Sequence, residues 1–190
     1  MRTKWAKGFF VGIDYGTTKS AIATIEAGGA PQLRNLGADN PSMPSSVKLS
    51  KYSTGNPPRF RIDRVGWWAK YADVKTNDTS CVFERSKLDI GKDGFKGYGP
   101  QNCNKNYDQV TPEDIAAIII KRLKNSIESK QSIEKRNVKT KIKAATITVP
   151  ASWNPIQREA TKYAGYLAGF EDVELIEEPV AALLTIGASF

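Results

Sequence analysis

The stretch that decides the fold stands near the start of the chain and reads Val11-Gly12-Ile13-Asp14-Tyr15-Gly16-Thr17-Thr18-Lys19-Ser20. An apolar run over residues 8–13 ends at the carboxylate of Asp14, and a second, alternating run covers residues 20–25. This pattern predicts two strands joined by a tight turn.

The turn between these strands has the composition of a phosphate-binding loop. Gly16 lets the backbone bend without a Cβ clash, and the amides and hydroxyls of Thr17 and Thr18 can then face one concavity. Asp14 stands where a hard cation would bridge to phosphates through water. On these residues alone an ordinary hairpin, in which the aspartate bonds to its own backbone, explains the turn equally well. The turn lacks the Gly-x-x-x-x-Gly-Lys pattern of a Walker loop.

A second informative segment, near the C-terminus, has the pattern of a strand, a helix and another strand. Residues 145–149 are rich in β-branched side chains and stop at Pro150. A capping box with proline at the first helical position follows, in Asn154-Pro155-Ile156-Gln157. Residues 173–176 form the next apolar run. The order predicts a βαβ unit.

A further helix is predicted from a clear start signal and a repeating apolar face. Thr111-Pro112-Glu113-Asp114 has the form of a capping box. Apolar residues then recur every four positions, at Ile115, Ile119, Leu123 and Ile127. This spacing predicts an amphipathic helix that packs on the core.

These segments resemble the 70-kDa heat-shock (DnaK-type) chaperone family. The resemblance rests on four motifs in the family's order. A strand ends in Thr-Val-Pro-Ala at 148–151, and a helix carries Gln-Arg and Ala-Thr within 157–161. That helix ends in Ala-Gly-x-x-Ala-Gly at 164–169, and Glu-Pro-x-Ala-Ala follows at 178–182. The family's first phosphate loop, Gly-Ile-Asp-x-Gly-Thr-Thr, stands at 12–18. A weaker match covers 65–70 and 83–88. Nearly the whole chain is similar to the first lobe of a family member.

The resemblance implies the α/β fold of the actin-like ATPases, a ribonuclease-H-like mixed sheet with packed helices. We expect residues 1–44 and 111–190 to form this core of the nucleotide-binding lobe. Residues 45–110 are expected to form an inserted small α+β subdomain, with part of its local core made by three aromatic residues, Trp67, Trp68 and Tyr71. The second lobe and the substrate-binding domain of the family are expected to be absent.

The resemblance also implies a site for ATP or ADP with Mg²⁺. It implies that Asp14 holds the metal through water and that the loop residues Gly16, Thr17 and Thr18 contact the phosphates. Lys19 follows the loop and would add positive charge near the phosphates. Glu178 matches a catalytic acid that holds the water shell of the metal.

Two further matches concern coupling and catalysis. Pro150 and Arg158 match positions that pass the nucleotide state to the substrate domain. The catalytic lysine of the family follows Phe-Asp-Ala, whereas Ser86 follows Phe83-Glu84-Arg85 here and Lys87 comes one place later. Either the register shifts by one residue, and Lys87 is the catalytic lysine, or that lysine is lost.

The predicted function is the binding and hydrolysis of ATP, coupled to the binding of client proteins. A J-domain co-chaperone and an exchange factor are the other implied partners, although Glu174 and Glu177 replace a basic residue and an amide of the family. A full-length parent is expected to be an ATPase, and this chain to be inactive and poorly soluble alone. A scaffold that binds nucleotide without hydrolysis, and another actin-superfamily kinase, are the alternatives.

Composition limits the other classes of function. The chain has 190 residues, no histidine and a formal charge of +8. Its densest basic stretch, residues 121–143, contains no aromatic residue, so a nucleic-acid partner is not expected. No apolar run is long enough to cross a membrane. We expect Cys81 and Cys103 to be free thiols, which is typical of a cytoplasmic protein.

Overall fold

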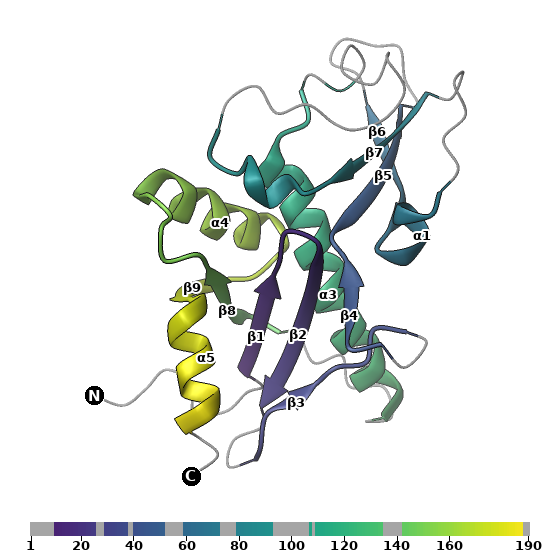
Figure 1. Ribbon diagram of the computed structural model, residues 1–190. Helices are drawn as coiled ribbons and strands as arrows, with labels where there is room; N and C mark the ends of the chain where they lie inside the picture. The colour runs from purple at the N-terminus through teal and green to yellow at the C-terminus, as the bar shows by residue number, and fades with distance from the viewer. Residues whose placement is uncertain are drawn as a thin grey trace.

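The computed structural model describes residues 10–25, 29–37, 40–51, 59–72, 79–92, 107, 109–134 and 142–187. These residues form two sheets with helices packed on them (Figure 1). The larger sheet has the strand order β3-β2-β1-β8-β9, with β4 also paired to β2. Its strands are β1 (Phe10–Tyr15), β2 (Lys19–Ile25), β3 (Gln32–Leu33), β4 (Ser42–Pro44), β8 (Ala144–Val149) and β9 (Asp172–Glu177).

The predicted hairpin and the predicted βαβ unit meet in this sheet. β1 and β2 pair antiparallel, from Phe10 with Ile25 to Tyr15 with Ser20. β8 lies parallel to both β1 and β9, with α4 (Pro155–Leu167) as the crossover between β8 and β9. The mixed α/β fold class is therefore confirmed.

The two helices with predicted cap signals begin where those signals place them. Thr111 and Asp114 exchange backbone and side-chain hydrogen bonds at the start of α3 (Pro112–Glu134). The side chain of Asn154 accepts from the Gln157 amide, while Gln157 caps Asn154 in return, so the capping box of α4 is complete.

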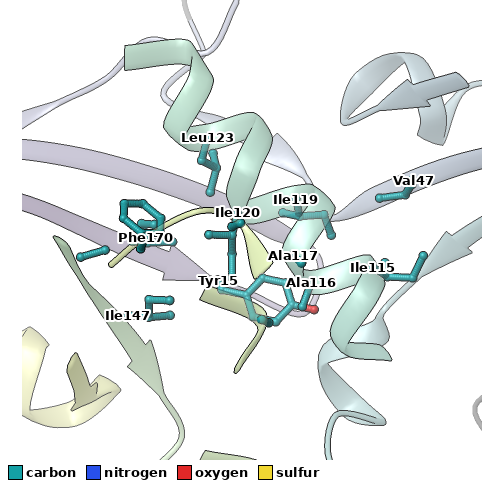
Figure 2. Packing of buried hydrophobic residues seen from close by; sticks show 14 of the residues in the cluster. Tyr15, Val47, Ile115, Ala116, Ala117, Ile119, Ile120, Leu123, Ile147 and Phe170 are labelled. Carbon is teal, nitrogen blue, oxygen red and sulfur yellow. The ribbon is translucent and has the colours of Figure 1, made fainter. Parts of the chain in front are cut away.

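One face of α3 supplies the centre of the core. Ile115, Ile119, Leu123 and Ile127 are each at most 1% exposed. All four belong to one buried cluster with Tyr15 of β1 and Ile147 of β8, and Figure 2 shows Ile115, Ile119 and Leu123 of this face. Burial of each such side chain stabilises the fold by about 1.5–3 kcal/mol.

A smaller antiparallel sheet stands beside the large one, in the order β6-β5-β7. Its strands are β5 (Ser46–Lys51), β6 (Phe60–Val65) and β7 (Ser80–Glu84). A single helical turn, α1 (Trp67–Lys70), follows β6, and a 3-10 turn, η1 (Ser86–Leu88), follows β7.

The expectation that Trp68 and Tyr71 pack in a local core is wrong. Their exposures are 73% and 71%. α1 has only four residues, and in a helix so short only one side faces the sheet, where Ala69 is fully buried. Trp67 is half-buried and stacks on Tyr71, with ring centroids 6.0 Å apart.

The free-thiol expectation is wrong for Cys81, which is disulfide-bonded. Cys81 lies fully buried on β7, and nothing in the local sequence pattern shows whether a buried thiol meets another in space. Cys103 lies outside the described residues. Because disulfides are rare in the cytosol, the cysteines no longer favour a cytoplasmic location.

The last helix is α5 (Glu178–Gly187). Leu183 and Leu184 on it are 67% and 61% exposed, an unusual degree for leucine. Among the described residues, no helix has the length and apolar character needed to span a membrane.

Candidate functional site

A cavity of about 560 Å³ opens where β1 and β8 end and α5 begins. Parallel strands place their carboxyl ends at one edge of a sheet, and ligands of open α/β sheets bind beyond that edge. The cavity is lined by Asp14, Gly16, Thr17, Lys87, Thr148, Pro150, Glu178, Ala181 and Ala182. Five of the residues predicted for the site from the matched motifs, Asp14, Gly16, Thr17, Lys87 and Glu178, thus meet at one place, together with Pro150.

Asp14 is held at the mouth of this cavity by a neighbouring strand. Thr148 donates its hydroxyl to Oδ1 of Asp14 at 3.1 Å, across 134 positions of sequence. Sequence reasoning missed Thr148, although its place two residues before Pro150, at the end of a strand parallel to β1, is the signal that points to it.

The turn after Asp14 needs its glycine for steric reasons. A Cβ on Gly16 would lie 2.1 Å from the carbonyl oxygen of Lys19, so no other residue closes this turn without a shift of the backbone. Ser45 then fixes the turn from outside: its hydroxyl donates to the Gly16 carbonyl at 2.7 Å and its amide to the Thr18 carbonyl at 2.9 Å. Ser45 is a second residue that the motif did not reveal.

Lys19 and Thr18 are not among the residues that line the cavity. Lys19 opens β2, and its ammonium lies 5.8 Å from the centroid of the Trp67 ring. The lysine therefore links the turn to α1 of the smaller sheet instead of facing the cavity with Thr17.

Lys87 is the buried cation of the site. Its side chain is 5% exposed, and its Nζ donates to Oε1 of Glu178 at 2.6 Å. The same nitrogen lies 5.8 Å from the centroid of the Tyr15 ring and 5.5 Å from that of Trp153. Two aromatic faces and a carboxylate thus stabilise a charge that has lost most of its water.

Ser86, the competing residue at this position, points elsewhere. Its hydroxyl and that of Tyr15 form a buried hydrogen bond of 2.8 Å. Arg85 has a φ of 56°, the one positive φ outside glycine in the described part of the chain. This left-handed residue turns the chain between β7 and η1, so that Lys87 and not Ser86 reaches the cavity.

Arg158 ties the loop after β8 to the end of β9. Its guanidinium donates to Oε1 of Glu177 at 2.8 Å, and its Nε donates to the Trp153 carbonyl at 3.1 Å. Glu177 immediately precedes Glu178, so the ion pair anchors the segment that carries the carboxylate partner of Lys87.

The mixed sheet and the helices packed on it have the architecture of an actin-like ATPase lobe. The chain belongs to the Hsp70 family, because the family model described as "Hsp70 protein" matches residues 10–189. Family membership implies the binding of a nucleotide.

Curated relatives agree with this assignment. The chain is 35% identical to the "Chaperone protein DnaK" of Thermotoga petrophila and of Thermotoga maritima over 181 residues, and to that of Thermosipho africanus at the same identity. Each comparison covers 95% of this chain and 26% of the relative. The chain therefore spans about a quarter of the length of these relatives.

Proposed function

We propose that this chain forms the phosphate-holding first lobe of a chaperone-type ATPase, in which the binding and hydrolysis of Mg-ATP are coupled to the binding of client proteins. One observation carries the proposal: the cavity gathers Asp14, Thr17, Lys87 and Glu178 from three separate segments of the chain. Carboxylates for a metal, a loop for phosphates and a buried cation are the parts that phosphoryl transfer requires.

The residues present fit a magnesium ion. Mg²⁺ keeps several waters and uses one or two carboxylates beside the phosphates, and the cavity offers two carboxylates, Asp14 and Glu178. Within the described ranges, no group of three or more histidine, cysteine, aspartate or glutamate side chains is arranged to hold a metal. When bound, the ion would neutralise charge on the phosphates.

Lys87 is proposed as the group that offsets negative charge on the transferring phosphate. A cation that is already desolvated needs little reorganisation to act on developing charge. The nearby carboxylate of Glu178, 44% exposed, holds that ammonium in place and also faces the cavity mouth. Thr148, through its bond to Asp14, keeps the metal-facing carboxylate oriented.

The position of Lys87 also bears on the first alternative, a scaffold that binds nucleotide without hydrolysis. That hypothesis drew on Ser86 in place of the family lysine. Because Lys87 lines the cavity and Ser86 does not, the observation supports hydrolysis by the complete protein. Family membership argues against the second alternative, a kinase.

The proposed partners are client proteins, a J-domain co-chaperone and an exchange factor. Glu174 is exposed, and Glu177 is paired with Arg158 near the end of β9. In a longer protein that contains this chain, we expect Glu174→Arg with Glu177→Asn to increase the stimulation of ATP hydrolysis by a general J-domain protein. Unchanged stimulation would count against this docking surface.

The site itself is tested by the binding of Mg-ATP to a longer protein that contains this chain, measured by calorimetry. We expect Asp14→Asn to weaken binding by about tenfold, the equivalent of about 1.4 kcal/mol. Asp172→Asn is the matched control, because Asp172 starts β9 and lies at the opposite end of that strand from the cavity. Equal affinity in the wild type and in Asp14→Asn would remove Asp14 from the site.

A further inference from the structure

We propose that β6 and α1 form a docking surface for an extended, acidic segment of a partner protein. The surface, here called the β6–α1 face, is made of exposed residues from two consecutive elements: Arg61, Ile62, Arg64, Trp68, Lys70 and Tyr71. It is separate from the cavity, none of whose lining residues belongs to it.

The first observation is the exposure of large apolar side chains. Trp68 is 73% exposed, Tyr71 is 71% exposed and Ile62 is 50% exposed. Single exposed apolar residues are ordinary, but aromatic residues that gather beside arginines are typical of the centre of protein interfaces. The sequence pattern predicted that these rings would be buried, and the structure instead leaves two of them open.

The second observation is charge. Strand β6 and the residues beside it carry Arg59, Arg61 and Arg64, and α1 ends in Lys70. The carboxylate here is Asp63, which already accepts hydrogen bonds from Arg61 and from the hydroxyl of Ser50. A surface of this composition attracts a negatively charged partner.

The third observation is how the cations and rings are arranged. The guanidinium carbon of Arg64 lies 5.9 Å from the centroid of Trp68, and Nζ of Lys70 lies 6.0 Å from the centroid of Tyr71. Each pair offers positive charge beside apolar area. A segment that presents both carboxylates and apolar side chains on one side matches both features.

The fourth observation selects a protein segment over a nucleic acid. Among the described strands, β6 pairs with β5 alone and stands at the edge of the smaller sheet. An edge strand accepts an extended peptide through backbone hydrogen bonds, while alternate side chains of that peptide contact the surface. A sugar-phosphate backbone cannot continue such a ladder, although its charge and bases would suit the arginines and the rings.

The test is a titration of the chain with a short fluorescent peptide that repeats Asp-Asp-Val-Val, which in an extended conformation places both residue types on the side that contacts the surface. We expect Arg64→Glu and Trp68→Ala each to weaken binding by about tenfold or more, and added salt to weaken it in the wild type. Lys121→Glu and Arg122→Glu provide the matched control, since both are exposed cations on α3, away from the face. Trp68 is so exposed that its removal should not affect folding, which circular dichroism would verify.

Three outcomes would overturn the proposal. An equal loss of peptide affinity in the α3 variants would show that the peptide responds to the net charge of the chain and not to the β6–α1 face. Tighter binding of oligothymidine, lost in the same two variants of the face, would assign the surface to nucleic acid. Undiminished binding of a peptide methylated at alternate backbone nitrogens would exclude pairing with β6. No nucleotide is present in these titrations, so their result is independent of the proposed ATP site.

Discussion

The ammonium of Lys87 donates to a carboxylate oxygen of Glu178 at 2.6 Å, although 91 positions separate the two residues. Their burial is unequal, since the lysine side chain is 5% exposed and the glutamate side chain 44%. Loss of the carboxylate would leave a buried charge without its main partner, which is costly. Loss of the lysine would leave a carboxylate that water can reach.

A comparison of Lys87 with Ser86 tests which of the two residues contacts the phosphates. We expect Lys87→Met to weaken Mg-ATP binding by about tenfold, the equivalent of about 1.4 kcal/mol. Ser86→Ala should leave the affinity near that of the wild type, because Ser86 faces Tyr15 and not the cavity. Calorimetry on both variants, with the folded fraction checked first, decides between them. The reverse order of effects would restore Ser86 as the residue at the site.

Arg158 and Glu177 should show a measurable but small coupling. Their side chains are 30% and 40% exposed, so water screens the pair. We expect a double-mutant cycle with Arg158→Met and Glu177→Gln to give a coupling free energy of about 0.5–1 kcal/mol in urea unfolding. Additive effects of the two changes would mean that the guanidinium acts through its bonds to the carbonyls of Trp153 and Ala151 and not through Glu177.

Tyr15 should make the protein sensitive to alkali. Burial raises the pKa of its hydroxyl well above the ordinary value of 10.0, against a smaller opposing effect of the bond to Ser86. The unfolded chain therefore loses this proton at a lower pH than the folded one. The associated stability is complete below about pH 10 and declines as the pH rises further.

The matched variant for this effect is Tyr15→Phe. It removes the hydroxyl and leaves Ser86 without its partner, at a cost of about 1–3 kcal/mol at neutral pH. We expect the unfolding free energy of the variant to fall less steeply above pH 10 than that of the wild type. Parallel curves of stability against pH would show that another group is responsible.

Gly165 should be far less tolerant of a methyl group than Gly12. A Cβ at position 165 would lie 2.9 Å from Val173 and 3.2 Å from Ile147, at the contact of α4 with the sheet. A Cβ at position 12 would meet nothing within 4 Å. We expect Gly165→Ala to lower the unfolding free energy by about 1–3 kcal/mol and Gly12→Ala to change it by well under that. Similar effects would mean that α4 shifts easily on the sheet.

Much of the fold was predictable because its signals are local. The alternation around the turn at Gly16 fixes β1 and β2, and the capping boxes mark the starts of α3 and α4. Asp14 and Thr17 reach the cavity because they stand at a strand end and in the turn beside it. Such positions depend on few residues, all near in sequence.

The rest depends on contacts that no local pattern encodes. Lys19 adjoins the phosphate-type turn, but as the first residue of β2 it is carried toward Trp67. Thr148 reaches Asp14 only because β8 pairs parallel with β1. Trp68 has the size and apolar character of a core residue. It lies on a helix of a single turn, however, and the side of that helix that faces the sheet is occupied by Ala69.

The pairing of β1 with β8 has a consequence for the making of the protein. Asp14 and Thr148 are 134 positions apart, so the ribosome completes the hairpin long before the strand that must lie beside it. At about 5–20 residues per second, the wait is on the order of ten seconds. During that time the edge of β1 that pairs with β8 in the folded protein has no native partner. The relatives of this chain are themselves named as chaperones.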